Sequence, residues 1–142
     1  MKRVRGFTLM ELMVVMAVLA IIASIAVPSY RSYMLRAQRA DATAALLALR
    51  SAQEKFFLQN GRYVTAQADM VADKPAGLGL SATSEHGHYN MTIAAGATPN
   101  TTFVATATAT GGQTKDAPCQ TFTINEAGVR SSGPNGITIC WK

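Results

Sequence analysis

A long apolar run opens the chain and contains a single acid. Residues 7–30 are almost wholly apolar, and Glu11 lies near the beginning of this run. A helix of about 20 apolar residues is long enough to cross the hydrocarbon core of a bilayer. A carboxylate inside such a segment costs about 3 kcal/mol on insertion scales, so Glu11 needs a compensating role. The pattern predicts a membrane-spanning helix over residues 7–28.

Helical periodicity continues beyond the apolar run. Within residues 29–57, apolar side chains recur at helical spacing at Ala42, Ala45, Leu46, Leu49, Ala52 and Phe56. They form one amphipathic face, which needs a packing partner. Pro28 lacks an N–H and clashes with the preceding turn, so we expect it to interrupt or kink the helix. Asn60 followed by Gly61 predicts the helix end.

Period-two alternation replaces the helical pattern in the second half of the chain. Residues 59–84 mix small, polar, Gly and Pro residues, which predicts a connecting loop with little regular structure. Strands are predicted over residues 88–94, 102–108, 120–125 and 137–141. An antiparallel sheet packed on the amphipathic helix face would bury both apolar surfaces. The expected fold class is therefore α+β, with a soluble head over residues 29–142.

The residues around the start of the apolar run resemble a known processing signal. Residues 1–6 form a short leader in which Lys2, Arg3 and Arg5 favour a cytoplasmic location. Residues 6–12, with the sequence GFTLMEL, resemble the class III signal of type IV prepilins. The resemblance implies cleavage between Gly6 and Phe7 by a membrane peptidase and N-methylation of Phe7 by the same enzyme. An ordinary secretory signal cut after Ala26, or a simple single-span anchor, would leave Glu11 unexplained.

The same resemblance gives Glu11 a role in assembly. After cleavage, the amine of Phe7 would be a cation among apolar helices, and a buried charge must be paired. The resemblance implies that this partner is the carboxylate of Glu11 on a neighbouring subunit. Such pairing would select the correct axial stacking of subunits more than it would add stability.

Two cysteines lie in the last quarter of the chain, Cys119 and Cys140. The membrane signal places them outside the cytoplasm, where a disulfide would persist. Two buried thiols are the alternative, and zinc is not expected because the sequence has no CxxC pair. A single disulfide near the C terminus resembles the one in type IV pilins, and residues 52–63 and 119–141 resemble PilE-type minor pilins.

Charged and polar residues suggest little chemistry. The net charge of +5 falls to about +2 when the three leader cations are removed. One cationic group follows the apolar run and is expected to anchor the helix at headgroup level: Arg31, Arg36 and Arg39. Another surrounds the predicted disulfide and is the better candidate for a basic patch that contacts nucleic acid: Lys115, Arg130 and Lys142.

No motif indicates catalysis. His86 and His88 flank Gly87, and on a strand they would share one face as a metal pair, but without further ligands we expect solvated loop histidines. The sequence has no GxSxG, P-loop or HExxH motif. We therefore expect no enzyme activity, no cofactor and no metal.

The resemblance implies a minor pilin of a type IV pilus, used for twitching motility, adhesion or surface sensing. Its partners would be other pilin subunits, the prepilin peptidase and methyltransferase, and the inner membrane, with the head in the periplasm before assembly and in an extracellular pilus afterwards. A pseudopilin of type II secretion is a second hypothesis. It is disfavoured by the cysteine pair and by a tail, residues 128–141, that has no acid for calcium. A DNA-binding minor pilin used in DNA uptake is the third.

Processing at Gly6 gives the first prediction. Co-expression with a prepilin peptidase should shorten the chain by six residues and leave N-methylated Phe7, as read by mass spectrometry of the intact protein. Substitution of Gly6 by a larger residue should block cleavage, because its side chain would obstruct the peptidase site. An intact Met1, or a new N terminus near Val27, would contradict the interpretation.

Overall fold

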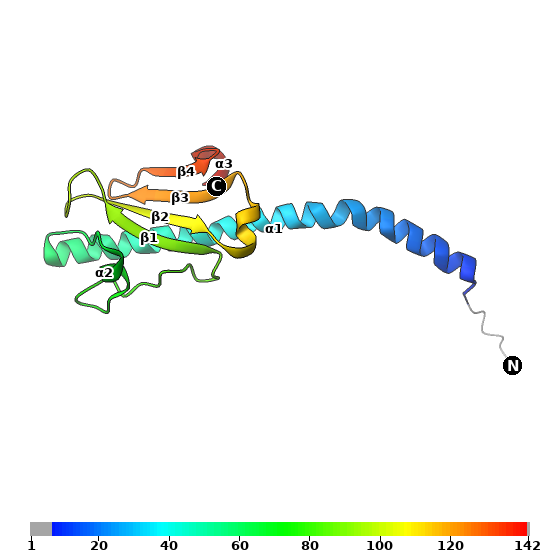
Figure 1. The fold of residues 1–142 in the computed structure, drawn as a ribbon, viewed down its shortest axis with the longest axis horizontal. Helices are drawn as coiled ribbons and strands as arrows, with labels where there is room; N and C mark the ends of the chain where they lie inside the picture. The colour runs from blue at the N-terminus through cyan, green and yellow to red at the C-terminus, as the bar shows by residue number, and fades with distance from the viewer. Residues whose placement is uncertain (1–6, 142) are drawn as a thin grey trace. The chain divides into compact units, whose positions relative to one another are not determined.

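The computed structural model describes residues 7–141. Its elements, in chain order, are α1 Leu9–Asn60, α2 Gln67–Val71, β1 Tyr89–Ala95, β2 Phe103–Ala109, the 3₁₀ helix η1 Gly111–Lys115, β3 Cys119–Asn125, β4 Arg130–Pro134 and α3 Ile137–Cys140 (Figure 1). The chain forms two units, Met1–Met34 and Leu35–Lys142, and the boundary between them falls inside α1.

The first unit contains the apolar part of α1. Thr8 caps this helix, because its Oγ1 accepts a hydrogen bond from the backbone N–H of Glu11 at 3.2 Å. Large apolar side chains along this part are exposed, and an 18-residue window has a mean hydropathy of 2.6. Among the described residues, α1 is the one helix long and apolar enough to cross a membrane.

Pro28 lies inside α1, so the predicted interruption is wrong. Proline removes one backbone hydrogen bond, and the uninterrupted turns on both sides carry the helix through it. A bend at Pro28 stays a prediction. The helix ends at Asn60, as the sequence predicts, and Gly61 follows with a φ of +66°.

The second unit contains a four-stranded antiparallel sheet in the order β1-β2-β3-β4. The pairing of β1 with β2 sets Met91 opposite Ala107 and Ile93 opposite Ala105, and all four side chains are buried. Three predicted strands are therefore confirmed, with boundaries shifted by one residue.

The fourth predicted strand is wrong. Residues 137–140 form the short helix α3, and the fourth strand of the sheet is β4, at the edge opposite β1. Ile137 and Ile139 alternate with polar residues, yet both are exposed, so their alternation reflects no buried sheet face. β4 is polar, and backbone pairing with β3 defines it as a strand.

The connecting segment also contains more structure than predicted, since α2 lies within it. Met70 of α2 is fully buried. The side-chain amide of Gln67 donates to Met91 O at 3.0 Å and accepts from Ile93 N at 3.1 Å. These bonds tie α2 to the edge strand β1.

The core of the second unit lies between the amphipathic part of α1 and the sheet. From α1 it takes the predicted residues Ala42, Leu46, Leu49 and Phe56, while Ala45 and Ala52 pack at its edge. Gln53 is fully buried in the same face. Its side-chain amide satisfies both backbone groups of Val64, donating to the carbonyl at 2.6 Å and accepting from the N–H at 2.9 Å. A polar residue is thus tolerated because both of its polar groups are bonded.

The disulfide gives the second prediction. Cys119 at the start of β3 is joined to Cys140 at the end of α3, 21 residues later. Reduction, or Cys119→Ser, should lower the melting temperature by several degrees, because closing a loop of this length stabilises the folded state by about 3 kcal/mol. Calorimetry of the full chain in detergent, with and without reductant, measures this shift. Two free thiols in protein expressed in the periplasm would contradict the pairing.

Candidate functional site

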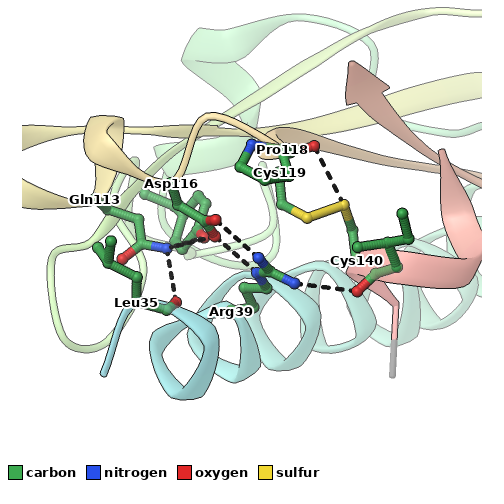
Figure 2. Close-up of polar contacts among 9 residues, drawn as sticks. Leu35, Arg39, Gln113, Asp116, Pro118, Cys119 and Cys140 are labelled. Carbon is green, nitrogen blue, oxygen red and sulfur yellow. Dashed lines mark hydrogen bonds and ion pairs between the residues drawn. A yellow bond between two sulfur atoms is a disulfide. The ribbon is translucent and has the colours of Figure 1, made fainter. Parts of the chain in front are cut away.

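A bidentate ion pair fastens α1 to the segment before the disulfide. The guanidinium of Arg39 donates from Nε to Asp116 Oδ2 at 2.7 Å and from Nη2 to Asp116 Oδ1 at 2.8 Å (Figure 2). Its Nη1 donates to the carbonyl of Ile139 in α3 at 3.0 Å. The side chains of Arg39 and Asp116 are only 11% and 4% exposed. Arg39 is therefore part of the head, which corrects its predicted role as a headgroup anchor.

Neighbouring polar groups extend this pair into a network. The side-chain amide of Gln113, on η1, donates to Tyr89 Oη at 2.9 Å, Leu35 O at 3.1 Å and Asp116 Oδ2 at 3.2 Å. The hydrogen bond to Asp116 raises the pKa of Arg39 above its ordinary value. Burial raises the pKa of Tyr89 to about 12.

The C-terminal residues pack against β3 and β4 beside the disulfide. Trp141 Nε1 donates to Ser131 O at 2.8 Å, and its ring meets Phe122 edge-on with centroids 5.8 Å apart. The guanidinium carbon of Arg130 lies 5.0 Å from the centre of the Trp141 ring, which is a cation–π distance. Arg130 is exposed, so this region presents a cation and an indole together.

The residues of the predicted basic patch do not lie together. Arg130 pairs with Ile124 near the end of β3, whereas Lys115 precedes Cys119 at the start of that strand. The length of β3 from Cys119 to Ile124 is about 17 Å. Lys142 lies outside the described residues. The structure therefore places Lys115 and Arg130 toward opposite ends of β3.

A second polar cluster surrounds Asp41 of α1. The carboxylate accepts hydrogen bonds from Ser84 Oγ at 2.6 Å, His86 N at 3.3 Å and His88 N at 3.4 Å, and His86 Nδ1 lies 3.2 Å from it. Burial favours the neutral acid, but the hydrogen bonds from Ser84 and His86 outweigh burial and hold the pKa of Asp41 below its ordinary value. Asp41 thereby fastens the loop before β1 to α1.

This cluster contains the residue types of a hydrolase triad in a different arrangement. Ser84 and His86 both contact the carboxylate of Asp41, whereas a triad requires the imidazole to contact the serine oxygen. The role of Asp41 was missed from the sequence. The spacing could have indicated it, because Asp41 lies at four-residue intervals with Ala45, Leu49 and Gln53 and therefore on the core face of the helix.

The remaining predicted site residues lie at the start of the chain. Phe7 precedes α1 and is 87% exposed, and Glu11 lies exposed in the first turn of the helix. Gly6 and the leader lie outside the described residues. Cleavage, methylation and the pairing of Glu11 stay predictions.

The fold is that of a type IV pilin. A solved structure of a type IV pilin from Shewanella oneidensis is 26% identical to the chain with a TM-score of 0.52, and the match covers 76% of this chain and 98% of that one. A comparison with curated proteins found no match.

Two family models match consecutive parts of the sequence. The prokaryotic N-terminal methylation motif matches residues 1–27, and the family described as "Type IV minor pilin ComP, DNA uptake sequence receptor" matches residues 28–123. The chain belongs to this type IV minor pilin family. The predicted α+β pilin fold and pilin family are thus confirmed.

Proposed function

We propose that the chain is a minor subunit of a type IV pilus, which primes assembly of the fibre or is incorporated into it. One observation carries the proposal: a methylation motif over residues 1–27 precedes a head that belongs to a minor pilin family. Before assembly, the apolar helix would anchor the subunit in the inner membrane with its head in the periplasm. The family match favours a pilus over a secretion pseudopilus.

Glu11 is central to this proposal, and the structure adds a local role for it. The residue lies in the first turn of α1, where the helix dipole favours an acid and where the Thr8 cap bonds to its N–H. Either Glu or Gln is suitable at the third residue after a Thr helix cap. Pairing with the amine of a neighbouring Phe7 requires a charge. The two roles can therefore be separated by substitution.

Glu11→Gln gives the third prediction. The variant should insert into the membrane and begin its helix normally, because the amide preserves the capping position and removes a costly charge. It should be incorporated into pili roughly tenfold less, a loss equivalent to about 1.4 kcal/mol, because the Phe7 amine lacks its counter-charge. Immunoblots of sheared pili, normalised to the membrane level of the subunit, measure this ratio.

Asp73→Asn is the matched control, because it removes one negative charge from an exposed position in the head. It should leave the ratio unchanged. If Glu11→Gln enters pili as efficiently as this control, pairing at Glu11 does not govern assembly of the subunit.

A second candidate function is DNA binding by the head. The description of the matched family as a DNA uptake sequence receptor supports it. So does the exposed Arg130 beside the Trp141 ring, since guanidinium groups bind phosphate and aromatic rings stack on bases. Lys115 precedes the start of β3 and Arg130 pairs near its end, so the two cations would contact separate phosphates of one duplex.

The fourth prediction tests this function with the full chain in detergent and a short DNA duplex. Binding measured by anisotropy across salt concentrations should weaken in the double variant Lys115→Ala, Arg130→Ala. The slope of log K against log salt should fall by about 2, because each phosphate contact contributes about 0.9. The double variant Lys55→Ala, Lys74→Ala removes the same charge elsewhere and is the control. Equal losses in both variants would show non-specific attraction and contradict a DNA site formed by Lys115 and Arg130.

A further inference from the structure

The head part of α1 borders a groove whose other wall is the segment that follows α2 (Figure 1). The volume of this groove is about 640 Å³, which lies within the range of about 300–1,000 Å³ that small-molecule sites occupy. Apolar side chains form much of its lining, namely Ala48, Ala52 and Phe56 on the helix and Pro75 and Leu78 on the segment. The groove can therefore take an apolar body the size of a small molecule.

Backbone hydrogen bonds fix the segment that forms the second wall. The N–H groups of Gly77, Leu78 and Gly79 all donate to carbonyls of α2 or of the two residues after it, at 2.8–3.0 Å. A Cβ at position 77 would overlap the carbonyl oxygens of Asp69 and Ala72, so this close approach requires glycine. The wall is therefore already formed in the folded head before any ligand binds.

Two lysines line the groove, Lys55 on the helix and Lys74 on the segment. The aliphatic stem of Lys74 runs along Gly79, since a Cβ placed on that glycine would lie 3.6 Å from Cγ and 3.7 Å from Cε of the lysine. None of the described residues that line the groove is acidic, and within residues 7–141 neither ammonium group has a carboxylate at ion-pair distance. Glu54, beside Lys55 in sequence, accepts instead from the Tyr63 hydroxyl at 3.3 Å. Two cations beside an apolar lining favour an anionic group on an apolar body.

The backbone of the wall favours a carboxylate over a phosphate. Phosphate sites commonly use several free backbone N–H groups or the N terminus of a helix. The N–H groups of residues 77–79 are already bonded within the segment, and Pro75 has none. The two ammonium groups can each donate to one of the two oxygens of a carboxylate.

We propose that this groove binds a small carboxylate ligand with an apolar, ring-sized body. The carboxylate lies between Lys55 and Lys74, and the body packs against Phe56, Pro75 and Leu78. The assignment concerns a face of the head that neither fibre assembly through Glu11 nor DNA contact through Lys115 and Arg130 uses.

The probe para-fluorophenylacetate, added to the full chain in phosphatidylcholine nanodiscs, tests the site by fluorine NMR relaxation. Nanodiscs contain no free detergent monomers, which would compete for an apolar groove. We expect saturable binding with a Kd of order 1 mM or tighter. The neutral amide of the same acid should bind about tenfold more weakly, because it lacks the charge that faces both lysines.

Substitutions separate the groove from general attraction of anions. Lys55→Gln and Lys74→Gln should each weaken binding about threefold, as expected for exposed charge pairs. Ala48→Leu keeps the charge but fills the groove, and it should weaken binding roughly tenfold or more. Because Ala48 is exposed, this variant should fold. Lys115→Gln removes the same charge from an exposed position outside the groove and should bind the probe like the wild type.

Four results would overturn the proposal. The first is no saturable binding at a probe concentration of about ten times the expected Kd. The second is equal binding of the acid and its amide, and the third is a wild-type affinity in Ala48→Leu or a loss in Lys115→Gln as large as that in Lys74→Gln. The fourth is displacement of the probe by inorganic phosphate at equal ionic strength, which would assign the lysines to phosphate.

Discussion

The ion pair between Arg39 and Asp116 is the interaction on which the C-terminal part of the head depends. Arg39 bonds both oxygens of Asp116 and the carbonyl of Ile139, so one side chain of α1 holds the segment before β3 and the helix after β4. The disulfide closes the same region, because it joins Cys119 to Cys140 (Figure 2). A buried ion pair repays its desolvation only when its geometry is good and its remaining groups are bonded. Here Gln113 supplies a further donor to Asp116.

Two charged residues near the start of the head part of α1 therefore each fix a different segment of the head to the helix. Arg39 holds the C-terminal region, and Asp41, two residues later, holds the loop that carries His86 and His88. The aliphatic face formed by Ala42, Leu46 and Leu49 packs under the sheet between these attachments and the helix end. The surface proposed to meet DNA is thus part of a head whose loops are fixed to α1, whereas the side chains proposed for fibre assembly are exposed in the first unit.

Local patterns in the sequence predicted the parts of this structure that depend on neighbouring residues. The helical face from Ala42 to Phe56, the stop at Asn60 and Gly61, and strands β1 to β3 follow from periodicity and turn chemistry. β4 was missed because its pairing with β3 is made by the backbone of a polar segment. The alternation of Ile137 and Ile139 was misleading because both side chains are exposed.

The polar attachments could not be predicted, because their partners are distant in the chain. Arg39 and Asp116 are 77 residues apart, and Asp41 and Ser84 are 43 residues apart. Periodicity places Asp41 and Gln53 on the core face, but it cannot name the groups that satisfy them. For the same reason the sequence does not distinguish Arg39 from Arg31 and Arg36, which follow the membrane segment with it. In the structure Arg31 and Arg36 are exposed, whereas the side chain of Arg39 is largely buried.

A double-mutant cycle on Arg39 and Asp116 tests the central claim most directly. Urea unfolding of the full chain in detergent would compare Arg39→Met, Asp116→Leu and the double variant with the wild type. Each single change should destabilise the head by about 3 kcal/mol, because it leaves the other charge buried without a partner. The loss of unfolding free energy in the double variant should be about 2 kcal/mol smaller than the sum of the losses in the two single variants. Additivity within about 0.5 kcal/mol would contradict the claim that this ion pair holds the C-terminal region on α1.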